Sequence, residues 1–88
     1  MLFRWGDKMN TKQAVINRII ELCKKNGLTP NALSYKAGVP QSTIKSILNN
    51  ETQNVGIVTI KKLCDGLDIT LPDFFNTESF RKLEQEIK

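Results

Sequence analysis

The sequence predicts an all-α protein with a single domain, and three observations lead to that prediction. Apolar residues recur at helical spacing in separate segments, and each segment ends at a glycine or a polar loop. No stretch alternates apolar and polar residues for long enough to predict a strand, since the pair Ile57-Val58 is too short. A chain of 88 residues is also too short to bury a second core.

The first helix is predicted over residues 11–26. Asn26-Gly27 supplies a stop signal, and the two lysines before it suit the negative end of the helix dipole. Four apolar residues repeat at i, i+3, i+4 and i+7, so we expect them to share one buried stripe. These residues are Ile16, Ile19, Ile20 and Cys23.

A short second helix is predicted from Pro30 to about Ala37. Thr29 is a good N-cap, and a proline fits the first turn because its missing N–H has no partner there. Leu33 and Ala37 are expected to face inward, and Gly38 ends the helix.

The third helix is predicted to begin near Pro40 or Gln41 and to end at the polar loop over residues 49–54. Its expected inner face consists of Ile44, Ile47 and Leu48.

The fourth helix is predicted over residues 58–67, with a buried stripe of Ile60, Leu63, Cys64 and Leu67. Residues 71–75 predict a one-turn fifth helix whose two phenylalanines cap the core. From Thr77 a last helix is expected, which either closes the core or contributes to a homodimer. Its apolar side consists of Phe80, Leu83 and Ile87.

The two cysteines, Cys23 and Cys64, lie on the helical stripes and have no CxxC or histidine partner. This excludes the usual zinc and thioredoxin-like sites and indicates core residues. The sequence shows no disulfide framework, no signal peptide and no apolar run approaching a membrane span. We therefore expect a cytoplasmic protein without a membrane partner, a metal or a cofactor.

Basic residues concentrate in the first part of the chain. Residues 1–62 hold ten Lys and Arg against three acids, a net charge of +7, whereas the remaining 26 residues carry −3. A cationic surface attracts a polyanion because neutralised phosphates release their counterions. Charge alone does not identify the partner, so a sequence motif is needed as well.

Residues 28–50, LTPNALSYKAGVPQSTIKSILNN, predict two short helices that cross at a steep angle around a tight turn. The corner needs a residue that tolerates a positive φ, and Gly38 provides it. The contact between the helices needs a small side chain four residues earlier, where Ser34 stands. Apolar contacts are expected at Leu33, Ala37, Val39, Ile44 and Ile47.

These residues resemble the helix-turn-helix of the Cro and phage-repressor (Xre-like) family, and the resemblance runs from about Val15 to Phe75, including IKKLCDGLDITLPDFF. It implies a five-helix, lambda-repressor-like DNA-binding domain over residues 11–76. Residues 1–10 are then an N-terminal extension, and residues 77–88 form a C-terminal helical tail. The implied function is sequence-specific binding of double-stranded DNA by a bacterial or phage transcriptional regulator. The expected form is a repressor that binds DNA as a homodimer.

In that family the second helix of the motif reads the major groove. By position and helical periodicity, the expected base contacts are Gln41, Ser42, Thr43, Lys45 and Ser46. Gln41 is suited to adenine N6 and N7, and Lys45 to guanine O6 or a phosphate. The expected backbone contacts are Thr29, Asn31, Lys36, Asn49, Asn50, Thr52, Asn54 and Lys61.

Two positions depart from the family pattern. Many members carry a buried Arg near the end of the first helix and a Glu near the end of the third, where this chain has Cys23 and Leu48. A buried ion pair barely repays its desolvation, so we expect an apolar contact between these two side chains instead. Pro40 stands where a capping Ser or Thr is usual, which removes one capping bond.

An enzymatic function is not expected. The chain has no histidine, no glycine-rich phosphate loop and no carboxylate pair in an apolar setting, and Asp65, Asp68 and Asp73 are spaced for turns and caps. The alternative function is that of an antitoxin or another protein-interaction module with the same fold, whose acidic C-terminal part binds a protein.

Residues 1–8 carry Phe3 and Trp5 without periodicity, and both a packed arm and a flexible extension remain open. Met9 is also a candidate start.

Overall fold

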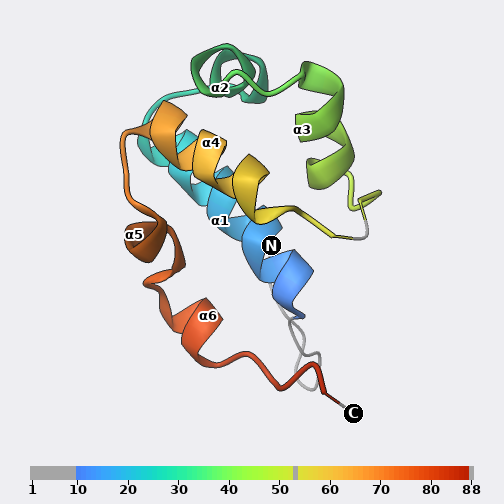
Figure 1. Ribbon diagram of the computed structural model, residues 1–88. Helices are drawn as coiled ribbons and strands as arrows, with labels where there is room; N and C mark the ends of the chain where they lie inside the picture. The colour runs from blue at the N-terminus through green and yellow to red at the C-terminus, as the bar shows by residue number, and fades with distance from the viewer. Residues whose placement is uncertain (1–9, 53, 88) are drawn as a thin grey trace.

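The computed structural model describes residues 10–52 and 54–87, and within these ranges it contains helices and no strand. The helices are α1 (Thr11–Lys25), α2 (Pro30–Ala37), α3 (Gln41–Leu48), α4 (Ile57–Leu67), α5 (Leu71–Phe75) and α6 (Glu78–Arg81) (Figure 1). The all-α prediction is confirmed for this part of the chain, whereas the predictions for residues 1–9 lie outside it. No helix among the described residues is long and apolar enough to cross a bilayer.

α1 begins at Thr11, as predicted, and ends at the predicted stop signal. The side chain of Asn10 accepts a hydrogen bond from the backbone N–H of Gln13 at 2.7 Å, which caps the first turn. At the other end Asn26 is the C-cap, and Gly27 adopts a φ of 64°. This positive φ is tolerated because glycine has no Cβ.

The buried face of α1 is rotated relative to the predicted stripe. Ile16, Ile19 and Cys23 are buried as expected, but Ile20 is 39% exposed and Leu22 is buried in its place. The prediction for Ile20 was therefore wrong. The helix buries a broad arc that also includes Ala14 and Val15, and Ile20 lies beyond the edge of this arc.

The turn between α2 and α3 has the predicted form. Thr29 caps α2 by accepting a hydrogen bond from the N–H of Ala32 at 3.1 Å, and Gly38 ends the helix at a φ of 66°. The buried hydroxyl of Ser34 donates to the carbonyl of Val39 at 2.5 Å. The N–H of Val39 donates back to the carbonyl of Ser34 at 3.2 Å. These two bonds hold the corner in one geometry, so the start of α3 has a defined direction.

α4 packs against α2 and forms the centre of the core, with the predicted stripe of Ile60, Leu63, Cys64 and Leu67 fully buried. The helices approach closely at Gly66, where a Cβ would lie 2.9 Å from both Cα and N of Ala37. No side chain larger than hydrogen fits at this crossing. The sequence analysis did not identify this contact.

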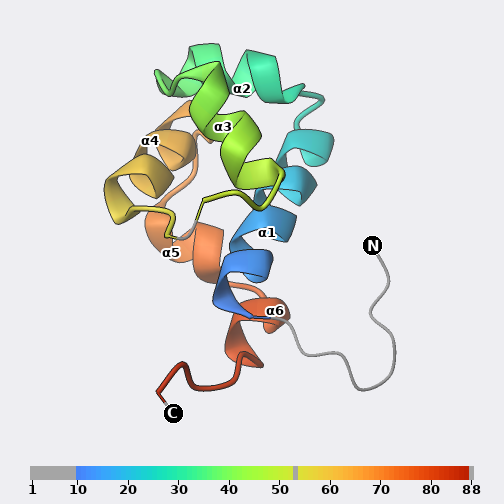
Figure 2. The same cartoon turned by 90° about the vertical axis from the view of Figure 1, so that its right-hand side faces the viewer.

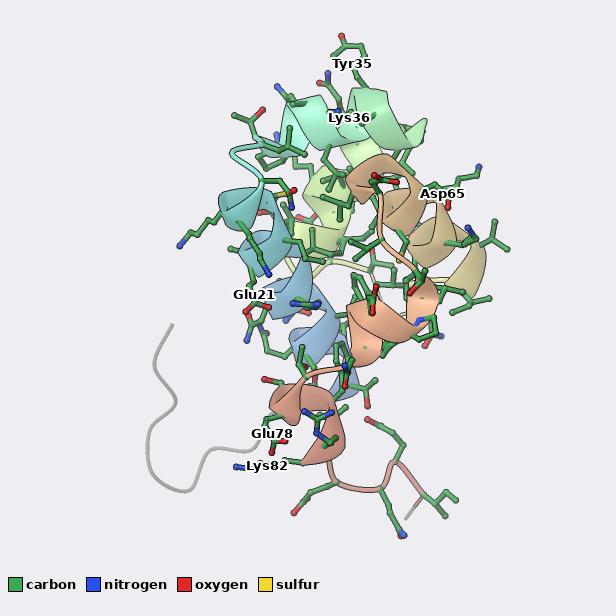
Figure 3. The ribbon with its side chains drawn as sticks, turned by 90° about the vertical axis from the view of Figure 1, so that its left-hand side faces the viewer. Glu21, Tyr35, Lys36, Asp65, Glu78 and Lys82 are labelled. Atoms are coloured by element: carbon green, nitrogen blue, oxygen red, sulfur yellow. The ribbon has the colours of Figure 1, made fainter. Side chains whose placement is uncertain are left out.

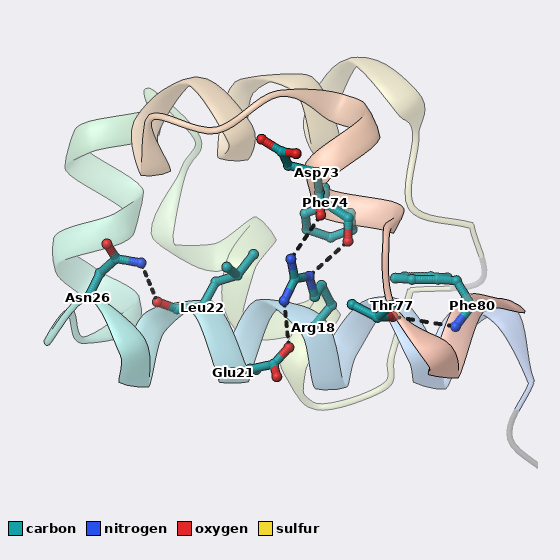
Figure 4. Close-up of polar contacts among 8 residues, drawn as sticks. All are labelled: Arg18, Glu21, Leu22, Asn26, Asp73, Phe74, Thr77 and Phe80. Carbon is teal, nitrogen blue, oxygen red and sulfur yellow. Dashed lines mark hydrogen bonds and ion pairs between the residues drawn. The ribbon is translucent and has the colours of Figure 1, made fainter.

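α5 is held against α1 by the guanidinium of Arg18, which is the centre of the contacts in Figure 4. Its Nε donates to the carbonyl of Phe74 at 2.8 Å, and a terminal nitrogen donates to the carbonyl of Asp73 at 2.9 Å. Another terminal nitrogen pairs with Glu21 at 2.6 Å. Arg18 thus supplies a donor to carbonyl groups at the end of a one-turn helix, of which that of Asp73 also accepts the N–H of Asn76 at 3.3 Å.

The C-terminal segment is less helical than predicted. α6 ends at Arg81, and residues 83–87 are not helical. Only Phe80 packs on the core, with its ring centroid 4.9 Å from that of Phe75, whereas Ile87 is 87% exposed. A helix continued through Leu83 and Ile87 would have no apolar surface to cover, and short helices without such packing are unstable in water.

Candidate DNA-binding surface

α3 lies at the side of the molecule and faces the viewer in Figure 2, with α2 crossing beside it. Ile44 and Ile47 are buried beneath it, as predicted, and Leu48 is partly buried against the same core. The opposite side of the helix is polar. Gln41, Ser42 and Lys45 are exposed, and Thr43 and Ser46 are half-buried. The structure therefore brings the five predicted base-contact residues together on one helix.

The start of α3 has no side-chain cap, because Pro40 occupies the N-cap position. The carbonyl of Pro40 accepts the N–H groups of Thr43 and Ile44 at 3.0 and 3.2 Å. The earlier N–H groups of the first turn have no such acceptor within the helix. This end of the helix is positively polarised and suited to an anion such as a phosphate.

The outer surface of α2 continues this polar region. Asn31 in its first turn is exposed, and Lys36 is exposed near its end. Figure 3 shows Tyr35 and Lys36 at the α2 end of the molecule, with Glu78 and Lys82 at the opposite end. Tyr35 is 80% exposed, so it adds an aromatic residue that the sequence analysis did not assign.

The loop after α3 presents Asn49, Asn50 and Asn54 to solvent, while Thr52 is half-buried. Asn50 adopts a φ of 61°, a conformation that asparagine tolerates better than most residues. Asn54 lines a hollow together with Lys12 of α1. The sequence analysis did not single out Lys12, because the sequence carries no local signal that places the start of α1 near this loop.

Lys61 lies on α4, outside α2, α3 and the turn between them. It forms an ion pair with Asp65 one turn later on α4, and both side chains line a shallow hollow beside α5. Asp65 is visible in Figure 3, which views the molecule from the side opposite to Figure 2. The spacing of four residues favours this pair on the outer side of the helix. The expected role of Lys61 as a backbone contact is not tested by this ion pair and stays a prediction.

The charged side chains of α2, the turn and α3 are all positive. Between Glu21 and Glu51 the sequence contains four lysines and no acidic residue, and this stretch includes α2, the turn and α3. All four lysines are exposed. The acids of the C-terminal part lie on α4, α5, α6 and the tail that follows. The surface that carries α3 thus attracts a polyanion.

The two cysteine thiols are core groups. Cys23 is 6% exposed and Cys64 is fully buried. Burial raises the pKa of both thiols, and the Asp65 carboxylate raises that of Cys64 further. Leu48 packs against the cluster that contains Cys23, at the position where many relatives have an ion pair. Their direct contact stays a prediction.

Comparison with known proteins decides the family. Residues 18–79 match the model of the Cro/C1-type HTH DNA-binding domain, which is most of the described chain. The chain belongs to the Cro/C1-type family. This membership confirms the resemblance predicted from the sequence, and it makes the chain a DNA-binding protein of the regulator class.

Three solved structures resemble this Cro/C1-type protein. Protein 11 of prophage Lp1 is 28% identical, with 88% of this chain and 100% of that chain covered and a TM-score of 0.75. An HTH_3 family transcriptional regulator from Vibrio cholerae is 26% identical, with coverages of 77% and 38% and a TM-score of 0.70. The SinR protein/SinI protein complex gives 29% identity, coverages of 82% and 69% and a TM-score of 0.65. No curated protein matches the chain.

Proposed function

We propose that this protein reads a short sequence in double-stranded DNA by inserting α3 into the major groove, and that it represses transcription by occupying that site. The observation that carries the proposal is the polar outer side of α3, which is held by the bonded turn between Ser34 and Val39. The proposed base contacts are Gln41, Ser42, Thr43, Lys45 and Ser46. Each presents a hydrogen-bonding group, as base-edge recognition requires.

Backbone contacts fix the orientation of the helix on the duplex. We assign them to residues whose polar groups flank α3, namely Thr29, Asn31, Lys36, Asn49, Asn50, Thr52 and Asn54. Their surroundings contain lysines and few acids, so phosphate binding costs little repulsion. We leave Lys61 out of this assignment because it pairs with Asp65 on the outer side of α4, and the Lys61→Ala variant below tests its predicted contact.

A homodimer suits this mode of binding. Helix-turn-helix proteins commonly bind two half-sites about 34–36 Å apart as a symmetric pair, and one α3 of eight residues contacts only a few base pairs. Sedimentation of the protein with and without its duplex measures the stoichiometry. A single protein chain on each duplex at saturation would rule out the dimer while leaving the role of α3 intact.

Selection of binding sites from random duplexes tests the proposal. We expect one enriched sequence, bound with an affinity that falls as salt rises. Lys45→Ala and Lys61→Ala form a matched pair, because both remove an exposed lysine from a helix. Lys45→Ala should weaken binding to the selected site, whereas Lys61→Ala should leave it nearly unchanged. The absence of any enriched sequence, or equal losses for the two variants, would contradict the proposal.

A second candidate function is binding to another protein. The SinR protein/SinI protein complex, which this chain resembles, contains two different proteins. The acidic residues beyond α4 and the cationic surface around α3 lie in different parts of this chain, so one protein can carry both functions. A partner that copurifies with the protein while duplex affinity is absent at low salt would favour this function over DNA binding.

A further inference from the structure

Ile57 and Val58 expose two large apolar side chains next to each other at the start of α4. They are 59% and 67% exposed, whereas Val55 before them is half-buried and Ile60 after them is buried. Single exposed apolar residues are ordinary, but contiguous ones mark contact surfaces. The other large apolar residues that are exposed in the described part of the chain stand far apart in the sequence, namely Ile20, Tyr35 and Ile87.

The segment that carries this pair is uncharged. Residues 52–60 contain no Lys, Arg, Asp or Glu, in a chain of which 25% is charged. Charged side chains begin only beyond the segment, at Glu51 and Lys61, and Lys61 is paired with Asp65. In a contact across a two-fold axis, residues near the axis meet their own copies, so a charge there would repel itself. An uncharged apolar segment is therefore complementary to a second copy of itself.

The position of the pair suits two copies on one duplex. In Figure 2, α3 faces the viewer and α4 begins at the edge of the molecule beside it. A two-fold axis that passes this edge parallel to the line of sight turns the α3 of a second copy to the same side. Half-sites about 34–36 Å apart place each α3 about 17–18 Å from the axis, which fits a molecule that is 24 Å across its two shorter dimensions.

The C-terminal segment, where the sequence also allowed a dimer contact, is less suitable. α6 and the residues after it lie at the end of the molecule opposite to α2 (Figures 1 and 2). An axis at that end would hold the two α3 helices farther apart than an axis beside the start of α4.

We propose that Ile57 and Val58 form the contact between two copies of this chain and that the pair assembles on DNA, an inference that rests on the proposed DNA-binding function. Stable complexes bury about 800 Å² on each partner, and two side chains supply only a small part of that area. The contact is therefore weak in the free protein. A duplex that holds two copies side by side raises their effective concentration and completes the contact.

Binding to two duplexes tests this contact. One is the duplex selected from the random pool, with both half-sites, and the other is the same duplex with one half-site scrambled. The double variant Ile57→Ser and Val58→Ser removes the apolar surface without adding a charge. It should bind the single half-site with unchanged affinity and need a several-fold higher concentration to fill both half-sites. Ile87→Ser is the matched control and should change neither, because it removes an apolar side chain that is 87% exposed in the C-terminal segment.

Cross-linking gives a second readout that does not depend on affinity. With Val58→Cys, a short bismaleimide should join the two chains on the duplex with both half-sites, and with Ile87→Cys it should not. Cys23 and Cys64 should not react, because they are 6% and 0% exposed.

Circular dichroism checks that each variant is folded. Equal binding of the double serine variant and the unmodified protein to both duplexes would overturn the proposed contact and leave DNA binding by α3 intact. So would a selected sequence without a repeated half-site, or a cross-link formed by Ile87→Cys and not by Val58→Cys. A protein that binds neither duplex would refute the DNA-binding function and this contact together.

Discussion

Gly66 shows how a single residue determines the distance between two helices. A Cβ at this position would lie 2.9 Å from the backbone of Ala37, and backbone atoms cannot move aside as the end of a flexible side chain can. Ser34 has a comparable role at the turn, where its small side chain fits between the helices and its hydroxyl is bonded to Val39. Small residues at these two points bring α2 close to α4 and set the direction of α3.

Gly66→Ala should therefore destabilise the protein by roughly 1–3 kcal/mol, the usual cost of overpacking a core. Gly56→Ala is the matched control, because nothing lies within 4 Å of a Cβ there and its φ of −65° suits any residue. Urea unfolding of both variants measures the difference in the free energy of unfolding. Equal stabilities for the two variants would contradict the close approach of α2 and α4.

Helices with local signals were predicted from the sequence, and contacts between distant segments were not. α2 and α3 depend on a threonine cap, a proline and a glycine within a few residues, and their bounds match the prediction. Which side chains lie on one helix follows from periodicity, so the grouping of the α3 residues was also predictable. The exposure of Ile20 and the end of α6 at Arg81 depend on the packing of neighbouring segments, which periodicity does not reveal.

Arg18 makes the clearest contact between segments that are distant in the sequence. Its loss should loosen the packing of α5 on α1. Arg18→Met keeps the apolar part of the side chain but removes the charged donor from the carbonyls of Asp73 and Phe74. The carbonyl of Asp73 then keeps only the longer bond from the N–H of Asn76 among the bonds described. We expect a cost of about 1–3 kcal/mol in the free energy of unfolding, the usual value for bonds to a charged donor. Hydrogen exchange should also become faster in α5.

Arg81→Met serves as the control, because it removes an arginine whose side chain is 55% exposed. An exposed ion pair contributes at most about 1 kcal/mol. A result in which both arginine variants lose the same stability, with no change of exchange in α5, would refute the role assigned to Arg18.

Positively and negatively charged side chains concentrate in different parts of the molecule. The helices on the DNA-binding surface contain lysines and no acids, and the acids gather from α4 onward. Such a separation orients the protein as it approaches a duplex and keeps the acidic part away from the phosphates. The proposed homodimer would double the number of phosphates that are neutralised.

The salt dependence of DNA binding measures that number. The logarithm of the binding constant should fall linearly with the logarithm of the salt concentration, with a slope of about −0.9 for each phosphate neutralised. Lys36→Ala should make the slope shallower by about 1 per chain and weaken binding to all sequences alike. A slope near zero for the unmodified protein would show that phosphates are not its main partner.

The most direct test of the proposed function is the affinity of Gln41→Ala for its selected duplex and for a scrambled duplex of equal length. The account predicts a loss of roughly 1–3 kcal/mol on the selected duplex and almost none on the scrambled one, because Gln41 is proposed to contact a base. Gln85→Ala, which removes an exposed glutamine from the C-terminal segment, should change neither affinity. Equal losses of Gln41→Ala on the two duplexes would contradict the claim that α3 reads the sequence.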